Sequence, residues 1–142
     1  MSDFAKSIEA FANRAILGVE EVSRVAAIEI GTKIIERTPV SDDWTAPGKP
    51  HGFLAGNWQT FIDAAPDTTI EIRPKSEAVA ELEETARRAT GRDVIVLRNN
   101  TVYGPRIEYE GWSHTKAPFG MVRNSVQEFG DAVNRAVEGI KP

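Results

Sequence analysis

The chain has 142 residues, of which 41% are hydrophobic and 27% are charged, and its formal net charge is −4. The length fits one domain, and the absence of cysteine excludes thiolate metal sites, iron–sulfur clusters, cysteine nucleophiles and disulfides. No run of like charge exceeds two residues, and no basic region followed by an apolar segment opens the chain. We therefore expect a soluble, mildly acidic protein made in the cytosol, with no nucleic-acid-binding arm and no membrane span.

A long helix is predicted for residues 3–37. Apolar residues recur at steps of three and four, which places them in one stripe on a helix: Phe4, Ile8, Phe11, Ala15, Val19, Val22, Ala26 and Ile30. Asp3 is the expected N-cap, and Pro39 ends the helix, because proline disfavours helical geometry in the residue before it. About 34 residues make a rod of about 50 Å, which overhangs a compact domain with a radius of gyration of about 14–15 Å.

Two arrangements of this rod are open. A kink near Gly18 or Gly31 would let both halves fold back onto one core. Alternatively, the rod packs once on its own sheet and once on a neighbouring subunit, because it carries apolar residues on two sides. The apolar residues that lie off the first stripe are Ile16 or Leu17, Ile28 and Ile35.

The remaining pattern predicts an α+β fold. Helices are expected at 76–90 and at 125–140, the latter opened by a capping box of Ser125 and Glu128. Strands are expected at 53–62, 69–73, 94–97 and 107–110, the third covered on both faces and the fourth nearer an edge. The prediction is one domain, residues 1–142, with the long N-terminal helix, a small mostly antiparallel sheet of about four strands, one short middle helix and a C-terminal helix. Gly and Pro predict irregular loops at 39–52 and 111–120.

The sequence predicts no catalytic, cofactor or metal site. Asp42, Asp43 and His51 could in principle bind a divalent ion, but loop residues of this kind are usually solvated. Glu108 and Glu110 are better explained by cross-strand ion pairs than by acid–base catalysis. No nucleophile elbow and no glycine-rich phosphate loop occurs in the chain. We therefore expect a protein that is not an enzyme.

The aromatic residues suggest an interface. Trp58 lies in an alternating segment and is expected in the core, whereas Trp44 and Trp112 lie in the two irregular loops. Exposed aromatic residues beside arginine are typical of protein–protein hot spots, although packing under their own loops is an equal alternative. The predicted interface residues are Trp44, Phe53, Trp112, Phe119 and Arg123.

Four motifs occur in series along most of the chain. They are Thr38-Pro39-Val40, Gly52-Phe53-Leu54-x-x-Asn57-Trp58, Asn99-Asn100-x-x-Tyr103-Gly104-Pro105-x-x-Glu108-Tyr109-x-Gly111 and Ala117-Pro118-x-Gly120-Met121-Val122-Arg123. Together they resemble the neck and tail-completion family of tailed bacteriophages, the small head–tail joining proteins. The chain departs from that pattern by an insertion at 41–51. The motif residues with expected structural roles are Pro39, Gly52, Leu54, Trp58, Tyr103, Glu108, Tyr109, Pro118 and Gly120.

Physical roles follow for some of these motif residues. Gly52 would permit an abrupt start of the first strand, and Trp58 would plug the space between sheet and helix. Glu108 would pair with Arg123 and pin residues 117–123 to the sheet, so its loss should destabilise the fold more than a surface change.

The resemblance implies a structural virion protein, made in the host cytoplasm, that joins or completes the head–tail interface of a phage or prophage. It would act by assembly into a ring, with the long helix and the two loops at the subunit contacts. Its partners would be other copies, head-connector proteins on the portal side and tail-tube or terminator proteins, with DNA passing nearby without specific binding. A tail terminator is the alternative of the same class. A small metal-dependent hydrolase and an adaptor that binds a peptide on a sheet edge are alternatives of other classes.

Overall fold

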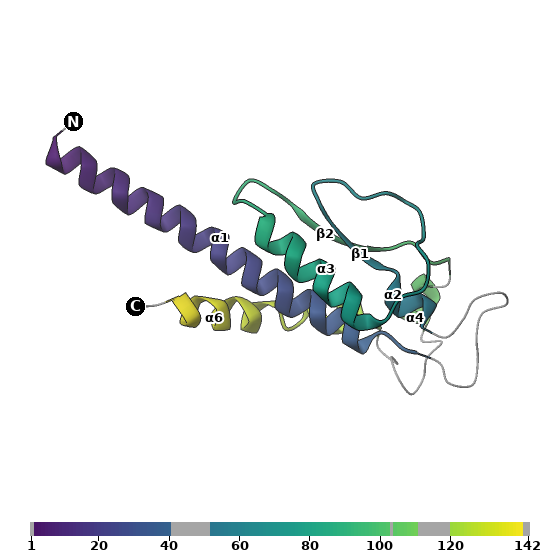
Figure 1. Cartoon of the computed structure of the whole chain (residues 1–142). Helices are drawn as coiled ribbons and strands as arrows, with labels where there is room; N and C mark the ends of the chain where they lie inside the picture. The colour runs from purple at the N-terminus through teal and green to yellow at the C-terminus, as the bar shows by residue number, and fades with distance from the viewer. Residues whose placement is uncertain (1, 41–51, 103, 111–119, 141–142) are drawn as a thin grey trace.

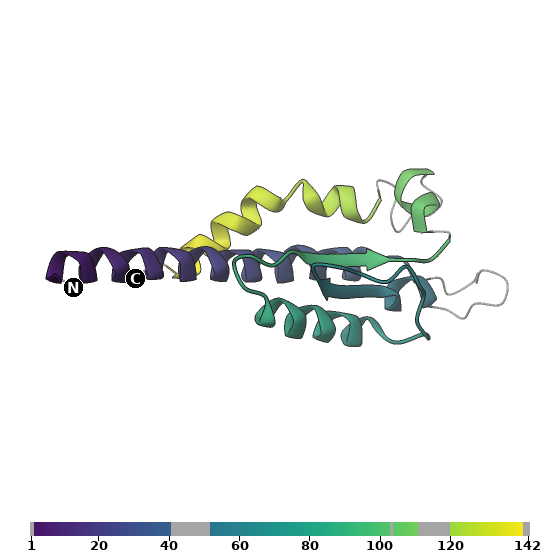
Figure 2. The same ribbon diagram turned by 90° about the horizontal axis from the view of Figure 1, so that it is seen from above.

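The computed structural model describes residues 2–40, 52–102, 104–110 and 120–140. The elements are α1 (Asp3–Arg37), α2 (Phe53–Gly56), β1 (Trp58–Ile62), α3 (Lys75–Arg88), β2 (Ile95–Asn99), α4 (Gly104–Glu110), α5 (Val122–Val126) and α6 (Phe129–Ile140). α1 lies between α6 and α3, and the β1–β2 pair packs against α3 (Figure 1 and Figure 2). The fold is mostly helical, so the predicted α+β class is wrong.

The predicted N-terminal helix is present and unbroken. Neither Gly18 nor Gly31 interrupts α1, so the kinked arrangement is not adopted. Gly31 serves close packing instead, because a Cβ atom at this position would overlap the Leu82 side chain of α3. Ser2, one residue before the predicted Asp3, is the N-cap. The helix therefore runs straight past its own domain (Figure 1).

The prediction of about four strands is wrong, because the described residues contain a two-stranded antiparallel sheet. In its register, Trp58 lies opposite Asn99 and Ile62 lies opposite Ile95. The first predicted strand begins as a helical turn, α2, after Gly52 adopts a left-handed backbone with φ of 81°. The last predicted strand, at 107–110, lies within α4. β2, predicted to be covered on both faces, is half-buried over its first three residues and pairs with β1 alone in the described part of the chain.

The predicted strand at 69–73 forms no ladder, because side chains take the hydrogen bonds that a strand would have made. Asn57 Oδ1 accepts from the backbone N–H of Ile70, and Asn57 Nδ2 donates to the Ile70 carbonyl. The Arg73 guanidinium donates to the carbonyls of Gly56 and Trp58. The segment is therefore tied to α2 and β1 without adding a strand.

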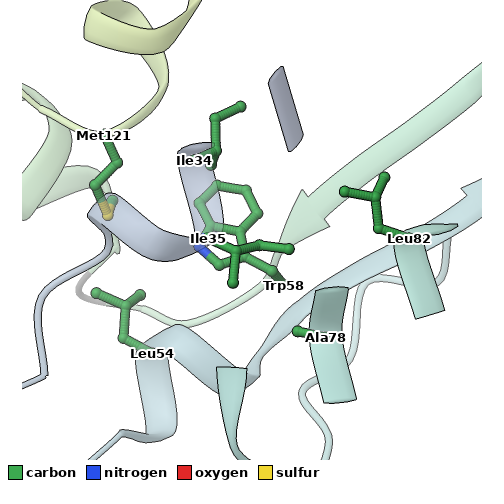
Figure 3. Close-up of a cluster of buried hydrophobic side chains, with 7 residues drawn as sticks. All are labelled: Ile34, Ile35, Leu54, Trp58, Ala78, Leu82 and Met121. Atoms are coloured by element: carbon green, nitrogen blue, oxygen red, sulfur yellow. The ribbon is translucent and has the colours of Figure 1, made fainter. Parts of the chain in front are cut away.

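The core gathers around Trp58. Figure 3 shows its indole among side chains from α1, α2, α3 and the start of α5. The cluster consists of Ile34, Ile35, Leu54, Trp58, Ala78, Leu82 and Met121. The indole Nε1–H donates to Thr38 Oγ1 at 2.7 Å, and that hydroxyl donates to the Ile34 carbonyl at 2.7 Å. Trp58 thus fills the space between sheet and helices, as predicted, and its polar edge ties the end of α1.

The C-terminal helix differs from the prediction at its start. Two helices, α5 and α6, replace the single helix from Ser125, and α6 begins at Phe129. The expected capping box does not form. Ser125 Oγ donates to the Met121 carbonyl, and the Glu128 carboxylate reaches α1. Two cations on α1 bind Glu128 more favourably than one local N–H does, because hydrogen bonds between charged groups are about twice as strong as neutral ones.

Candidate interaction surface

The first half of α1 has an uncovered apolar face. Residues 2–17 are exposed apart from the half-buried Ala5, and this part of the helix projects beyond every other element (Figure 1 and Figure 2). Its largest stripe residues keep most of their surface: Phe4 is 76%, Ile8 54%, Phe11 66% and Val19 64% exposed. With Ala15, these residues form a surface that we call the free stripe. Single exposed apolar residues are ordinary, but an aligned series of them indicates a binding surface.

The free stripe continues the face of α1 that α6 covers. Each stripe residue has a counterpart eighteen positions later, which is about five turns at roughly 3.6 residues per turn, so both sets point the same way. The counterparts are Val22, Ala26, Glu29, Lys33 and Arg37. Three of them bind the C-terminal part of the chain: Lys33 Nζ and Arg37 Nη2 lie 2.8 and 3.0 Å from Glu128, and Glu29 pairs with Arg135.

Ion pairs hold the C-terminal part of the chain against the covered half of this face. Hydrogen bonds from Arg37 and Lys33 lower the pKa of Glu128 to about 2, and Arg135 lowers the pKa of Glu29. The aligned free half carries apolar side chains where the covered half carries these ions. The two halves of one helix face therefore differ: one binds α6 of the same chain through ion pairs, and the other carries exposed apolar side chains.

Glu108 organises the short helices beside the core. Its buried carboxylate accepts the backbone N–H groups of Met121, Val122 and Arg123 at 2.5 to 2.9 Å. Arg123 Nε lies 3.2 Å away, so the predicted Glu108–Arg123 pair is present. Burial raises the pKa of Glu108, but the three N–H groups and the guanidinium outweigh burial and hold it below its usual value. Gly120 (φ 87°) is required here, since a Cβ would overlap the Glu108 carboxylate.

The Glu108–Arg123 pair joins different elements from those predicted. Glu108 lies on α4 and not on a sheet, so it joins α4 to the start of α5. Arg123 also stacks over the Tyr109 ring, 5.0 Å from its centroid, and Tyr109 is 70% exposed.

The predicted interface residues are only partly placed. Phe53 is buried beside the core, so it offers no surface to a partner. Arg123 is half-exposed but engaged with Glu108 and Tyr109. Of the motif residues, Leu54 and Trp58 belong to the core, and Pro39 follows the C-cap of α1. Trp44, Trp112, Phe119, Tyr103 and Pro118 lie outside the described residues.

The alternative sites gain no support from the described residues. Asp42, Asp43 and His51, the candidate metal ligands, fall outside them, and the described ranges contain no group of three His, Asp or Glu residues that could hold a metal. Within those ranges no helix is long and apolar enough to cross a bilayer. An open hollow of about 440 Å³ lies between Val40 and Lys75, where Lys75 Nζ is bonded to the Glu36 carbonyl.

Comparison with known proteins gives no relative. The chain matches no protein-family model, no curated protein and no solved structure. The resemblance to the neck and tail-completion family therefore rests on the four sequence motifs.

Proposed function

We propose that the protein is a structural subunit that joins or completes the head–tail interface of a tailed phage or prophage. It acts by stoichiometric assembly into a ring of copies between the head connector and the tail. The observation that supports the proposal is the free stripe. Its exposed apolar side chains lower the solubility of the single chain and contribute nothing to its core. The four motifs supply the phage assignment.

The polar clusters that the structure describes support an architectural role. Glu108 holds α5, Glu128 holds α6, and Glu81 joins Arg73 to the backbone N–H of Thr60 at the edge of β1. Each of these carboxylates is already bonded to backbone or cationic groups of the same chain. A ring interface needs more than about 1,000 Å² of buried surface, and the projecting half of α1 offers an aligned apolar surface that can contribute to it.

The proposal is tested by deleting the gene in the phage or prophage that encodes it. Loss of a head–tail joining subunit should leave filled heads and tails of normal length that do not attach. The wild-type chain should restore joined particles, whereas Phe4→Ser/Phe11→Ser should not, because polar residues remove the apolar contact. Asn13→Ser, on the opposite face of the same helix, is the matched control. Joined, infectious particles without the protein would end the proposal, and over-long tails would indicate a terminator.

A further inference from the structure

We infer that two copies of the free protein pair through the free stripe, with their α1 helices antiparallel and crossing at Phe11. This pairing shares the uncovered face with the proposed function but goes beyond it, since it holds for the protein outside any particle. The partner of the stripe is then a second copy of the same segment, residues 3–19.

The exposed apolar area of the free stripe favours a second free stripe as its partner. With about 200 Å² for a fully exposed large apolar residue, the four large residues of the stripe present roughly 500 Å² per copy. The exposed pair at the α5–α6 junction, Val126 and Phe129, presents about 200 Å² on the same basis, too little to cover the stripe. Two stripes together present roughly 1,000 Å², which is the most that their contact can bury and equals the lower limit for a specific interface, so the pair should dissociate on dilution.

The position of α6 favours an antiparallel orientation of the two α1 helices. A parallel neighbour on the stripe would continue along the face of α1 from Val22 to Arg37, and α6 already occupies that face. An antiparallel neighbour centred on Phe11 uses the same 3–19 segment of both copies. Each helix then extends past the other's N-terminus, beyond which a single copy has no other described helix or strand (Figure 2). Because α1 is one unbroken helix, the two copies need no rearrangement to meet.

Charge does not oppose the contact. The whole chain carries −4, so two copies repel at long range, but residues 3–19 carry two acids and two bases: Asp3, Glu9, Lys6 and Arg14. The paired segments are therefore neutral. Ile16 and Leu17, which are 56% and 61% exposed, lie off the stripe and stay exposed in the pair. A paired copy therefore still offers apolar surface to a further neighbour.

Disulfide mapping tests the pairing, and the absence of native cysteine makes single-cysteine variants clean reporters. Helix axes 8–10 Å apart, with Cα atoms about 2.3 Å from each axis, bring facing Cα atoms to about 3.4–5.4 Å, and the upper part of this interval lies within disulfide range. Phe11→Cys should cross-link to itself on mild oxidation. Phe4→Cys and Val19→Cys should cross-link when mixed but not alone. Asn13→Cys, on the opposite face, is the control: it keeps the stripe and should pair, but it should not cross-link.

Light scattering over a concentration series gives the second readout. Phe11→Glu should raise the concentration at which half the protein is dimeric by at least about tenfold, with unchanged circular dichroism. Self-linking at positions 4 and 19 would show a parallel pair and overturn the inference. Oligomers that form without a Phe11 cross-link would also overturn it, and would leave the head–tail role standing. A mapped pair combined with normal particles from the gene deletion would overturn the head–tail role alone.

Discussion

Replacing Glu108 by alanine should be among the most destabilising single changes outside the hydrophobic core. The carboxylate is 5% exposed and is the acceptor for three backbone N–H groups, those of Met121, Val122 and Arg123. A buried donor left without a partner costs about 1–3 kcal/mol, and removal of one member of a buried ion pair costs about 3–5 kcal/mol. Because Arg123 is half-exposed and can turn to water, we expect about 3–4 kcal/mol.

Urea unfolding measures the loss. With a slope of about 2 kcal/mol per molar urea, Glu108→Ala should lower the midpoint by about 1.5–2 M. Glu84→Gln, an exposed change on α3, is the control and should stay within about 0.5 kcal/mol of the wild type. Native-state hydrogen exchange should also show loss of protection at the amides of residues 121–123. A midpoint shift below about 0.5 M with these amides still protected would refute the role given to the carboxylate.

The Glu108 carboxyl also makes the stability of the protein depend on pH, in a direction set by its lowered pKa. The pKa of Glu108 is lower in the folded protein than in the unfolded chain, so the unfolded chain binds more protons as the pH falls. Its contribution to stability is complete above about pH 5 and is lost as the pH falls through the folded-state pKa, below about 4.3. The stability difference between wild type and Glu108→Gln should therefore shrink on acidification below pH 4. A constant difference from pH 7 to pH 3 would contradict the assignment.

Three further changes test the packing of α1. Gly31→Val should lower the stability by about 1–3 kcal/mol in urea unfolding, because the new side chain enters the space held by α3. Thr38→Val should cost about 1–3 kcal/mol, because the buried indole N–H of Trp58 loses its acceptor; an unchanged melting temperature would contradict this. Glu128→Gln, or 1 M salt in the wild type, should accelerate amide exchange in α6 without affecting α3, because the contact between α1 and α6 depends on ion pairs.

The long helix could be predicted because its signal is long. Apolar residues at steps of three and four over some thirty positions cannot be mistaken for another period. The helical structure of residues 107–110 could not be predicted, since the alternation of Ile107-Glu108-Tyr109-Glu110 spans four residues and fits a strand and one turn of helix equally well. The deciding contact, Glu108 with the amides of Met121 and the first two residues of α5, joins residues 13 to 15 positions apart.

The hydrogen bonds that the sequence did not predict share one property. Asn57 holds the backbone of Ile70, and Glu128 holds Lys33 and Arg37, and none of these pairs is adjacent in sequence. Local rules assign Glu128 to a capping box with Ser125, three residues before it. The tertiary contact prevails because the ends of α1 and α6 place two cations within reach. Sequence spacing carries no signal for such a contact.

The free stripe is the feature that a self-sufficient domain would not need. Residues 3–19 can stay helical without tertiary support, because α1 is already nucleated by its packed half and the segment contains four alanines, Ala5, Ala10, Ala12 and Ala15. Lysine and glutamate at the stripe positions would propagate the helix equally well and would be more soluble. On the proposed pairing, the apolar residues serve contact rather than folding. Substitution of Phe4 and Phe11 should accordingly leave the urea midpoint of the single chain unchanged while abolishing association, and a loss of stability equal to that of a core change would show that the stripe is buried within its own chain.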